Sequence, residues 1–413
     1  MRPRGDAPAG AGIATGSASG GGGEYQYRGC VGTGGRADGS GSVPGRGYCP
    51  LPGSIRAFHH CRATGRGERC WPIDAREEPG ADNTGLRAAH PYHVGAYAPF
   101  FIHPGVKYLV TGATGFIGVE LCRQIMQAGD ELSACSASGR LLPDGTATRA
   151  LDLRGEQPDS HALVGIDAVV HLAGIAHRSA GAQEYELVNH QATVALARRA
   201  AEAGVGAFVF LSSVKAMGPA ITDQPRAESQ CSLPDDAYGR SKRDAERALI
   251  DECSGGPMSV TILRPALVYG EGARGNLALL SRAVANGLPR PPADGGRSMI
   301  DRGDLCRLIR LLAARDEPGI HTYIAADGEV YSTRRIYDAL RGAMGLPPGR
   351  NWCPRWGWRL GCGLLDLMSS NPEPAWQRLF GVETYSSEAL RRELGWQPRQ
   401  TLEKALRGSG EPA

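Results

Sequence analysis

The sequence predicts an α/β fold, a doubly wound parallel sheet followed by a smaller, mostly helical cap. From about residue 106 onward, short apolar runs alternate with amphipathic helical patterns, as parallel strands joined by crossover helices require. The alternation loosens after Gly270, where prolines and a glycine-rich turn interrupt it, and the region 331–406 then follows a helical pattern. Because ligands of doubly wound folds bind at the carboxyl edge of the sheet, we expect the cap to lie over that edge.

Residues 1–105 differ from the rest of the chain. They are rich in Gly, Ala, Arg, Ser and Pro, contain no Lys, and include the low-complexity run GSASGGGG at 16–23. Such a segment cannot bury enough apolar surface to offset its conformational entropy, so it is predicted to be a disordered extension. Its cysteines match no zinc-ligand spacing, and no metal site is expected; they are Cys30, Cys49, Cys61 and Cys70.

The composition argues against several kinds of partner. A net charge of +3 over 413 residues offers no electrostatic reason to expect nucleic acid or an anionic membrane. The longest apolar stretch, Leu360 to Met368, is too short to span a bilayer and contains Asp366. The eleven cysteines include no C-x-x-C pair, as is usual for free thiols in a reducing compartment, and a cytoplasmic location is expected.

The first predicted strand leads into a glycine-rich turn, VKYLVTGATGFIG at 106–118. Gly112 permits a tight turn, Gly115 lets the backbone approach a pyrophosphate, and Gly118 lets the following helix pack close to the strand. The free N–H groups and the dipole at the helix start attract phosphates. The turn, with Phe116 and Ile117, therefore predicts a dinucleotide-binding site, although its spacing is G-x-x-G-x-x-G rather than the commoner G-x-G-x-x-G.

The remaining elements follow from the periodicity of apolar residues. A cofactor-binding domain is predicted over 106–270, completed by about 301–330, with the cap built from 271–300 and 331–408. The strands are expected near 106–111, 131–135, 148–152, 167–172, 207–212, 259–264 and 321–326, and helices near 115–128, 185–203 and 237–252.

Tyr238 and Lys242 lie four positions apart on the helix predicted over 237–252, and therefore share one face. A tyrosine phenol has a pKa near 10. A neighbouring ammonium, together with a positive nicotinamide ring, is expected to lower this pKa by roughly one to three units. Tyr238 could then exchange a proton with a hydroxyl or ketone near neutral pH while a hydride moves to or from the cofactor.

The glycine turn and the Y-x-x-x-K pair together resemble the extended short-chain dehydrogenase/reductase family, which includes NAD-dependent epimerases and dehydratases with a Rossmann sheet. The resemblance implies that Ser213, Tyr238 and Lys242 are the catalytic set, with Ser213 bonding the reacting oxygen and Lys242 also bonding the nicotinamide ribose. It implies that an Asn is structural at position 189. Further cofactor contacts are implied at Asp152, at Leu172 and Ala173 in the HLAG stretch, and at Pro265 in LRPALVYG.

The end of the second predicted strand leaves NAD and NADP both open. NAD specificity usually needs an acid there, to bind the ribose hydroxyls. Residues 135–140 read CSASGR and contain no acid, whereas Ser136, Ser138 and Arg140 could hold a 2′-phosphate. His171 and His177 are expected to be packing or loop residues rather than catalysts.

The substrate side is predicted mainly from the resemblance. Asn276 and Arg297 lie where nucleotide-sugar members of the family hold uridine diphosphate, with Asp304 following Arg297 in the family's spacing, and Arg suits a diphosphate by geometry and charge. Lys215 either meets a polar substituent of the sugar or is solvated. The SSVKAMG stretch, the run Asn276-Leu277-Ala278 and the Trp-containing cap most resemble bacterial UDP-4-keto-6-deoxy-N-acetylglucosamine 4-reductases, often labelled UDP-glucose 4-epimerase-like. The tail ELGWQPRQTLEKAL resembles the C-terminal end of sugar-nucleotide epimerases.

The resemblance therefore implies an NAD(P)-dependent oxidoreductase or epimerase that acts at C4 of a UDP-sugar in polysaccharide precursor synthesis, and leaves a homodimer open. Dehydratases of the family carry an adjacent Asp–Glu pair after the serine, where this chain has Val214 and Lys215. One alternative is a ketoreductase for a steroid- or flavonoid-like substrate, which would not need Arg297. The other is a non-catalytic NAD(P)-sensing regulator, which would not need the three catalytic residues.

Overall fold

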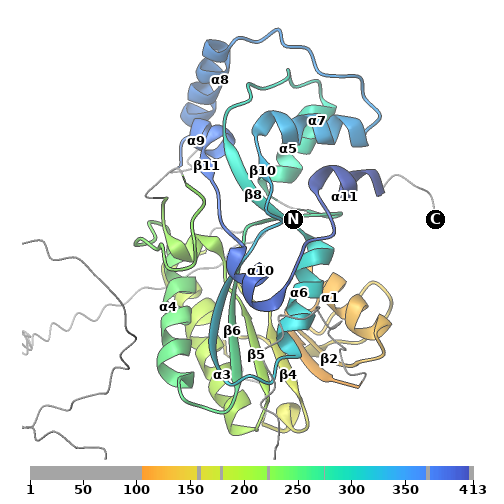
Figure 1. Ribbon diagram of the computed structural model, residues 1–413, viewed down its shortest axis with the longest axis vertical. Coiled ribbons are helices and arrows are strands. Elements are labelled where there is room, and N and C mark those ends of the chain that lie inside the picture. Colours follow the sequence, from red (N-terminus) through yellow and green to blue (C-terminus); the bar gives the residue numbers. More distant parts are fainter. Residues whose placement is uncertain are drawn as a thin grey trace, which may run out of the picture. The chain divides into compact units, whose positions relative to one another are not determined.

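The structure is a computed structural model that describes residues 105–155, 160–176, 180–220, 224–273, 275–368 and 373–408 (Figure 1). The disordered extension and the metal-free cysteines predicted in the N-terminal region fall on residues 1–104, outside the described residues. His177 lies outside them as well.

A seven-stranded parallel sheet forms the centre of the described part, as predicted. Its strand order is β3-β2-β1-β4-β5-β6-β9, so the chain starts in the middle and winds outward in both directions. All seven predicted strands are present within a few residues of their expected bounds. They are β1 Lys107–Thr111, β2 Glu131–Ser136, β3 Arg149–Ala150, β4 Ala168–His171, β5 Ala207–Leu211, β6 Ser259–Pro265 and β9 Gly319–Ala325.

Helices cover both faces of this sheet, which explains why central strands such as β4 and β5 are almost continuously apolar rather than alternating. Tyr108 and Val110 pack on one face with α1 (Phe116–Gln127) and α6 (Arg302–Ala313). Leu109, from the same strand, packs on the other face with α3 (Ala192–Glu202) and α4 (Ala237–Cys253). Before α3 the chain forms a short helix, α2 (Ala182–Tyr185), and a π-helical turn at Glu186–Gln191.

The cap is mainly helical, but it also contains four short strands that the sequence analysis does not predict. Strand β8 pairs with β7, β10 and β11, and two of these partners are only two residues long, too short to show a periodic pattern. A separate apolar cluster that includes Tyr269, Tyr331 and Tyr337 forms its core. The cap elements are α5 Asn276–Ala285, α7 Thr333–Ala343, α8 Arg355–Met368, α9 Ala375–Phe380, α11 Leu402–Gly408, β7 Leu267–Tyr269, β8 Gly296–Asp301, β10 Val330–Tyr331 and β11 Val382–Glu383.

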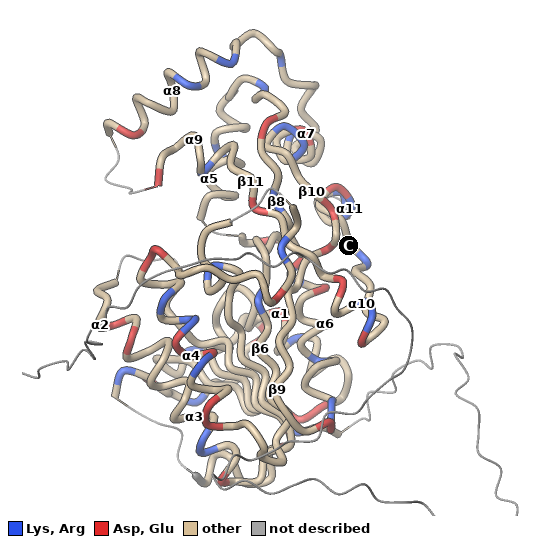
Figure 2. The backbone as a smooth tube through the Cα atoms, turned by 60° about the vertical axis from the view of Figure 1, so that its left-hand side comes forward, with Lys and Arg blue, Asp and Glu red and all other residues tan. Residues whose placement is uncertain are grey.

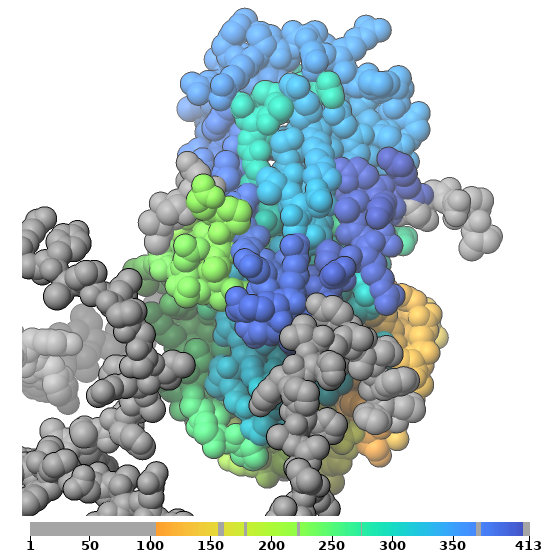
Figure 3. All heavy atoms as spheres, viewed as in Figure 1, coloured from red at the N-terminus to blue at the C-terminus, as the bar shows by residue number. Residues whose placement is uncertain are grey.

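The last part of the chain, dark blue in Figure 3, lies across the junction between the sheet and the cap. Helix α10 (Glu388–Leu394) and the following Trp396 pack into the core on the α6 side of the sheet. The buried Asp304 carboxylate accepts the backbone N–H groups of Arg399 and Gln400, at 2.6 and 2.9 Å. Asp304 therefore holds the C-terminal segment against the start of α6.

Candidate functional site

The glycine turn after β1 has little room for side chains, so a ligand can approach its backbone. Gly112 has a φ of 71°, and a Cβ added there would lie 2.7 Å from the backbone nitrogen of Ala173. A Cβ on Gly118 would overlap the carbonyl oxygen of Gly112. Gly115 caps the start of α1, and no side chain satisfies the cap there. The N–H groups at this helix start have no side-chain cap, so they can bind the pyrophosphate of a dinucleotide.

Replacing Gly118 with Ala is expected to lower the free energy of unfolding by about 1–3 kcal/mol, because the new methyl group overpacks against immobile backbone. The matched control is Gly342→Ala near the end of α7, where an added Cβ meets open space. That variant is expected to be neutral or stabilised by up to about 1 kcal/mol. Denaturant titration of both measures the difference, and equal stabilities would contradict the close approach of helix and strand.

The end of β4 lies against this turn. The backbone N–H of Leu172 donates to the carbonyl of Thr111 at 3.2 Å, and that of Ala173 approaches the Thr111 hydroxyl at 3.3 Å. At the helix start, the Arg302 guanidinium lies 5.1 Å from the centre of the Phe116 ring, and Ile117 packs against the core. Pro265 ends β6 in a buried position. The structure thus brings the predicted contacts of β1 and β4 together at one carboxyl edge.

Two other predicted cofactor contacts are engaged with neighbours. The Asp152 carboxylate pairs with Arg154 at 2.6 Å, and hydrogen bonds from Arg154 hold the pKa of Asp152 below its usual value. The Ser136 hydroxyl is buried and bonds the Thr148 hydroxyl at 2.7 Å. The suggestion that Ser136 holds a 2′-phosphate is therefore wrong for this structure, because its oxygen is already enclosed in the protein. Ser138 and Arg140 lie exposed at the same strand end.

Ser213, Tyr238 and Lys242 come together where β5 and α4 meet. Helix α4 begins at Ala237, and the Asp236 carboxylate caps it by accepting the N–H of Gly239 at 2.8 Å. This places Tyr238 in the first turn, with its side chain close to that of Ser213 just beyond β5. One turn later, the buried Lys242 ammonium donates to the carbonyl of Leu211 at 3.0 Å.

Burial is the largest influence on the pKa values of Tyr238 and Lys242. Burial raises the pKa of Tyr238 to about 12, and the hydrogen bond with Ser213 opposes this shift without cancelling it. Burial also lowers the pKa of Lys242 to about 8, against the attraction of Glu246. In the protein without cofactor, burial therefore decides the pKa of Tyr238, and the lowering expected from the ammonium and the nicotinamide ring together stays a prediction for the complex.

Two further residues near the site have structural roles. Asn189 is fully buried; its side chain exchanges hydrogen bonds with the backbone of Ile175 and donates to the Ser241 hydroxyl at 3.1 Å. This joins the loop after β4 to α4. His171 is also fully buried between the hydroxyls of Thr111 and Thr193, and burial lowers its pKa to about 3. Its neutral, enclosed ring is a packing group, as expected.

Next to the candidate catalytic residues lies a buried ion pair that the sequence analysis missed. Glu246, one turn after Lys242 on α4, accepts the Ser212 hydroxyl at 2.5 Å and two N–H groups of Arg264 at 2.9 and 2.7 Å. Arg264 comes from β6 and also donates to the carbonyl of Glu228. The pair joins β5, β6 and α4 at the site. The i, i+4 spacing of Lys242 and Glu246 could have placed Glu246 near the site, but nothing in the sequence indicated its pairing with Arg264.

A second carboxylate, Glu383 of β11 in the cap, contacts the loop that follows Ser213. It binds the Lys215 ammonium at 3.0 Å and the Arg297 guanidinium at 2.9 Å. Burial opposes the charge of Lys215, but Glu383 outweighs it and raises the Lys215 pKa. The Lys215 side chain is 46% exposed despite this pairing, and its expected contact with the sugar stays a prediction. Arg297 also donates to the carbonyls of Gln377 and Arg378, so much of its guanidinium is held within the cap.

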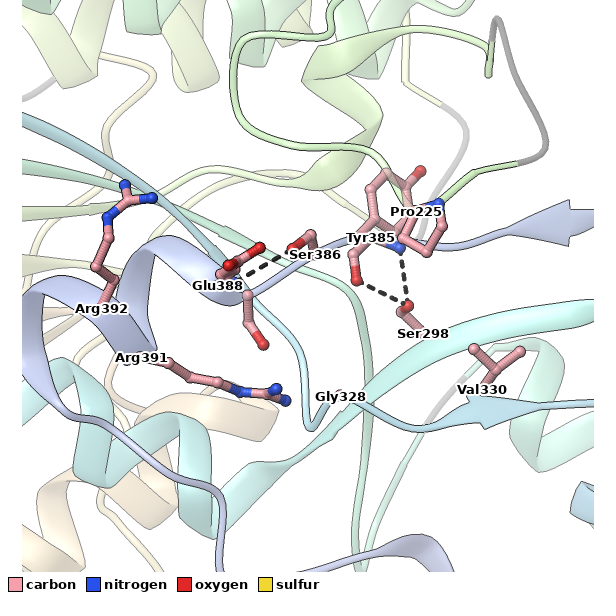
Figure 4. Close-up of a pocket in the computed structure, with 10 residues that line it drawn as sticks. Pro225, Ser298, Gly328, Val330, Tyr385, Ser386, Glu388, Arg391 and Arg392 are labelled. Carbon is pink, nitrogen blue, oxygen red and sulfur yellow. Dashed lines mark hydrogen bonds between the residues drawn. The ribbon is translucent and has the colours of Figure 1, made fainter.

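A pocket of about 510 Å³ lies elsewhere in the cap (Figure 4). Ser298 lines it, whereas the preceding Arg297 faces Glu383, because neighbouring residues of a strand point to opposite sides. Asn276, the first residue of α5, is exposed and lines neither feature. The pocket is therefore separate from the candidate catalytic site. Its lining residues are Pro225, Ser298, Gly328, Val330, Tyr385, Ser386, Ser387, Glu388, Arg391 and Arg392.

Comparison with known proteins adds independent information. Residues 108–325 match the model of the NAD dependent epimerase/dehydratase family. UDP-glucose 4-epimerase of Vibrio cholerae is 29% identical over 313 residues, which cover 73% of this chain and 94% of that protein. The 2-alkyl-3-oxoalkanoate reductase of Stenotrophomonas maltophilia is 25% identical over 73% of this chain and 98% of its own length. The structure of MoeE5 in complex with UDP-glucuronic acid and NAD matches with a TM-score of 0.59 and 25% identity, over 73% of this chain and 96% of that one.

Proposed function

Because the chain belongs to the NAD-dependent epimerase/dehydratase family, we propose that it is an NAD(P)-dependent enzyme acting at C4 of a UDP-sugar, by 4-keto reduction or 4-epimerisation. The observation that most supports this is the placement of the Tyr238 side chain beside Ser213, with the buried Lys242 one turn later on α4. The similarity to UDP-glucose 4-epimerase along nearly the whole length of that protein supports the sugar-nucleotide substrate. We propose a role in the synthesis of polysaccharide precursors on the same grounds.

The proposed chemistry assigns one task to each residue. Tyr238 moves a proton between its phenol oxygen and the C4 oxygen of the sugar, and Ser213 orients that oxygen toward the phenol. Lys242 holds a positive charge behind the phenol and bonds the cofactor ribose. When bound over the turn of Gly112, Gly115 and Gly118, NAD(P) supplies or accepts a hydride. The high pKa of Tyr238 keeps its proton in place until substrate and cofactor enter the site.

The ionisation of Lys242 predicts a limit on the alkaline side. Its pKa of about 8 means that the ammonium is present below that pH and is lost above it. We expect kcat/KM for the cofactor, which reports the free enzyme, to fall as the pH rises through about 8. A Lys242→Arg variant keeps its charge and should lack this fall, even if its activity is lower. A wild-type profile that stays flat well above that pH would contradict the assignment.

The two residues after Ser213 disfavour dehydration. Removal of a proton from C5 and protonation of the departing C6 hydroxyl need two acid–base groups. Val214 is a buried aliphatic residue, and the Lys215 ammonium is paired with Glu383. A lysine cation has no lone pair, so it cannot accept the proton from C5. Reduction or epimerisation at C4 requires only the proton and hydride transfers described above. It needs no acid–base group at Val214 or Lys215.

The product formed separates these reactions. With UDP-glucose or UDP-N-acetylglucosamine and catalytic NAD, we expect no 4-keto-6-deoxy sugar, measured by its absorbance in alkali. With a 4-keto-6-deoxy UDP-sugar and NADH or NADPH, we expect oxidation of the reductant in proportion to substrate. A growing 4-keto signal without added reductant would reject the proposal. Parallel assays with NADH and NADPH decide the cofactor preference, which we leave as NAD or NADP.

A second candidate function is the reduction of a ketone outside sugar metabolism. The similarity to 2-alkyl-3-oxoalkanoate reductase, over 98% of that protein, favours it. The discriminating assay is NAD(P)H oxidation with 3-oxoalkanoates beside the 4-keto UDP-sugar. Such a substrate has no diphosphate, so Arg297→Ala should leave its reduction unchanged but should raise KM for a UDP-sugar. For the UDP-sugar we retain Asn276, Arg297, Lys215 and Ser213 as proposed contacts, with the cap formed by 271–300 and 331–408.

A further inference from the structure

We propose that the outer face of α8 is a docking surface for a lipid bilayer with anionic headgroups. In the described part of the chain, no helix is both long and apolar enough to cross a membrane. A helix that lies in the plane of the bilayer surface has different requirements: an apolar face, aromatic residues near the headgroups, and basic residues beside them. Helix α8 contains all three: its second half is the longest apolar stretch of the sequence, and its aromatic and basic residues precede that stretch.

The apolar face of α8 is a continuous stripe, which we define as Trp356, Leu360, Leu364 and Leu367. Their spacing of four, four and three residues places them on one side of the helix, over about 17 Å of its length. Their exposed fractions are 70%, 61%, 55% and 85%. Isolated exposed apolar residues are ordinary, but a contiguous row of four large ones indicates an interaction surface.

The opposite side of α8 accounts for the rest of its packing. Cys362 is buried, and Trp358 packs with it against Phe380 of α9. The N–H of Ala375, the first residue of α9, donates to Asp366 at 2.7 Å. The stripe therefore has no part in holding α8 to the cap. Figures 1 and 2 place α8 at the end of the cap farthest from the sheet.

The charges beside the stripe complement an anionic surface. Basic residues occupy the first half of α8 and the segment before it, and a single acidic residue lies near its end (Figure 2). Arg359 is exposed and lies 5.2 Å from the ring centre of Trp376. Arg355 pairs with Asp294 at 3.0 Å while remaining largely exposed. Trp352, 69% exposed, precedes them, so an indole and guanidinium groups lie together where headgroups and acyl chains would meet.

These features favour a bilayer over a second copy of the chain. Guanidinium groups beside an apolar row match lipid phosphates, which can gather around them, whereas a second copy would bring its own arginines to the same face. The net charge of +3, which offers no reason to expect a membrane partner, averages over the whole chain and conceals this local arrangement.

The test is flotation of the full-length protein with vesicles of equimolar phosphatidylglycerol and phosphatidylcholine, and with vesicles of phosphatidylcholine alone. We expect the protein to float with the mixed vesicles. The triple variant Trp356→Ser, Leu360→Ser, Leu364→Ser should reduce the bound fraction by roughly tenfold or more, because it removes the apolar surface that enters the bilayer. Arg359→Glu should weaken binding to the mixed vesicles and leave binding to phosphatidylcholine unchanged.

The matched control is Leu233→Ser with Leu279→Ser, since these leucines are 76% and 61% exposed outside α8. It should bind vesicles as the wild type does. Circular dichroism and NAD(P)H binding confirm that all variants are folded, independently of any activity. The proposal is overturned if the full chain floats with neither vesicle, if the control loses binding as the triple variant does, or if light scattering shows a dimer that only the triple variant dissociates.

Discussion

Replacing Tyr238 with Phe is expected to slow turnover by roughly a hundredfold or more while leaving cofactor affinity nearly unchanged. The variant keeps the ring, which packs near Tyr185, and removes only the phenol oxygen, which lies near Ser213. Without that oxygen, no proton can pass between the residue and C4 of the substrate. Steady-state kinetics with a 4-keto UDP-sugar and titration of NAD(P)H fluorescence measure the two effects separately.

Two other variants show whether this loss is specific to proton transfer. Lys242→Ala should weaken both turnover and cofactor binding, because Lys242 is proposed to bond the cofactor ribose as well as to provide charge. Tyr185→Phe is the matched control: Tyr185 is a buried neighbour, with its ring centre 6.1 Å from that of Tyr238, and we assign it no proton transfer. Near-normal turnover of Tyr238→Phe would remove the phenol from the mechanism.

Replacing Glu246 with Gln is expected to lower the free energy of unfolding by about 3–5 kcal/mol. The side chains of Glu246 and Arg264 are only 2% and 7% exposed, so neither charge has access to much water. Glutamine keeps the shape and one oxygen acceptor but leaves the guanidinium charge uncompensated in the interior. Loss of one partner of a buried pair is more damaging than the net stabilisation by the pair itself. Equilibrium unfolding in denaturant measures the change.

The matched control is Glu252→Gln, on the same helix. Glu252 pairs with Arg198 at 2.6 Å, but these side chains are 37% and 56% exposed, so the loss of stability should be much smaller than for Glu246→Gln. Equal losses for the two variants would mean that water reaches Glu246. A second readout is kinetic: Glu246 favours the charged form of Lys242, so its removal should lower the Lys242 pKa and shift the alkaline limit of activity to lower pH.

Much of the site could be predicted because its signals are local in the sequence. The turn of Gly112, Gly115 and Gly118 needs only a strand, a tight bend and a helix start within thirteen residues, 106–118. Tyr238 and Lys242 share a face because the helical repeat brings residues four apart together. The central strands of the sheet are recognisable because burial on both faces makes them almost continuously apolar, as in β4 and β5.

Other parts of the site depend on contacts between distant segments. Glu383 lies 168 residues after Lys215, and only the folding of the chain through the cap brings β11 close to the loop that contains Lys215. Glu246 and Arg264 lie on separate elements, α4 and β6, so their pairing has no periodic signature. The pKa of Tyr238 could not be predicted either, because its direction depends on the balance between burial and charge in three dimensions.

The sequence by itself determined the fold class, the family resemblance and the Ser213, Tyr238 and Lys242 hypothesis, since each rests on the identity and spacing of residues along one or two elements. Only the tertiary structure decided which carboxylates meet which cations, and which apolar face of α8 is packed. Both faces of that helix are apolar in the sequence, but Cys362 packs against α9 while Leu360 and Leu364 are left exposed. Spacing specifies which side chains share a face, whereas packing between elements decides whether that face is covered by protein.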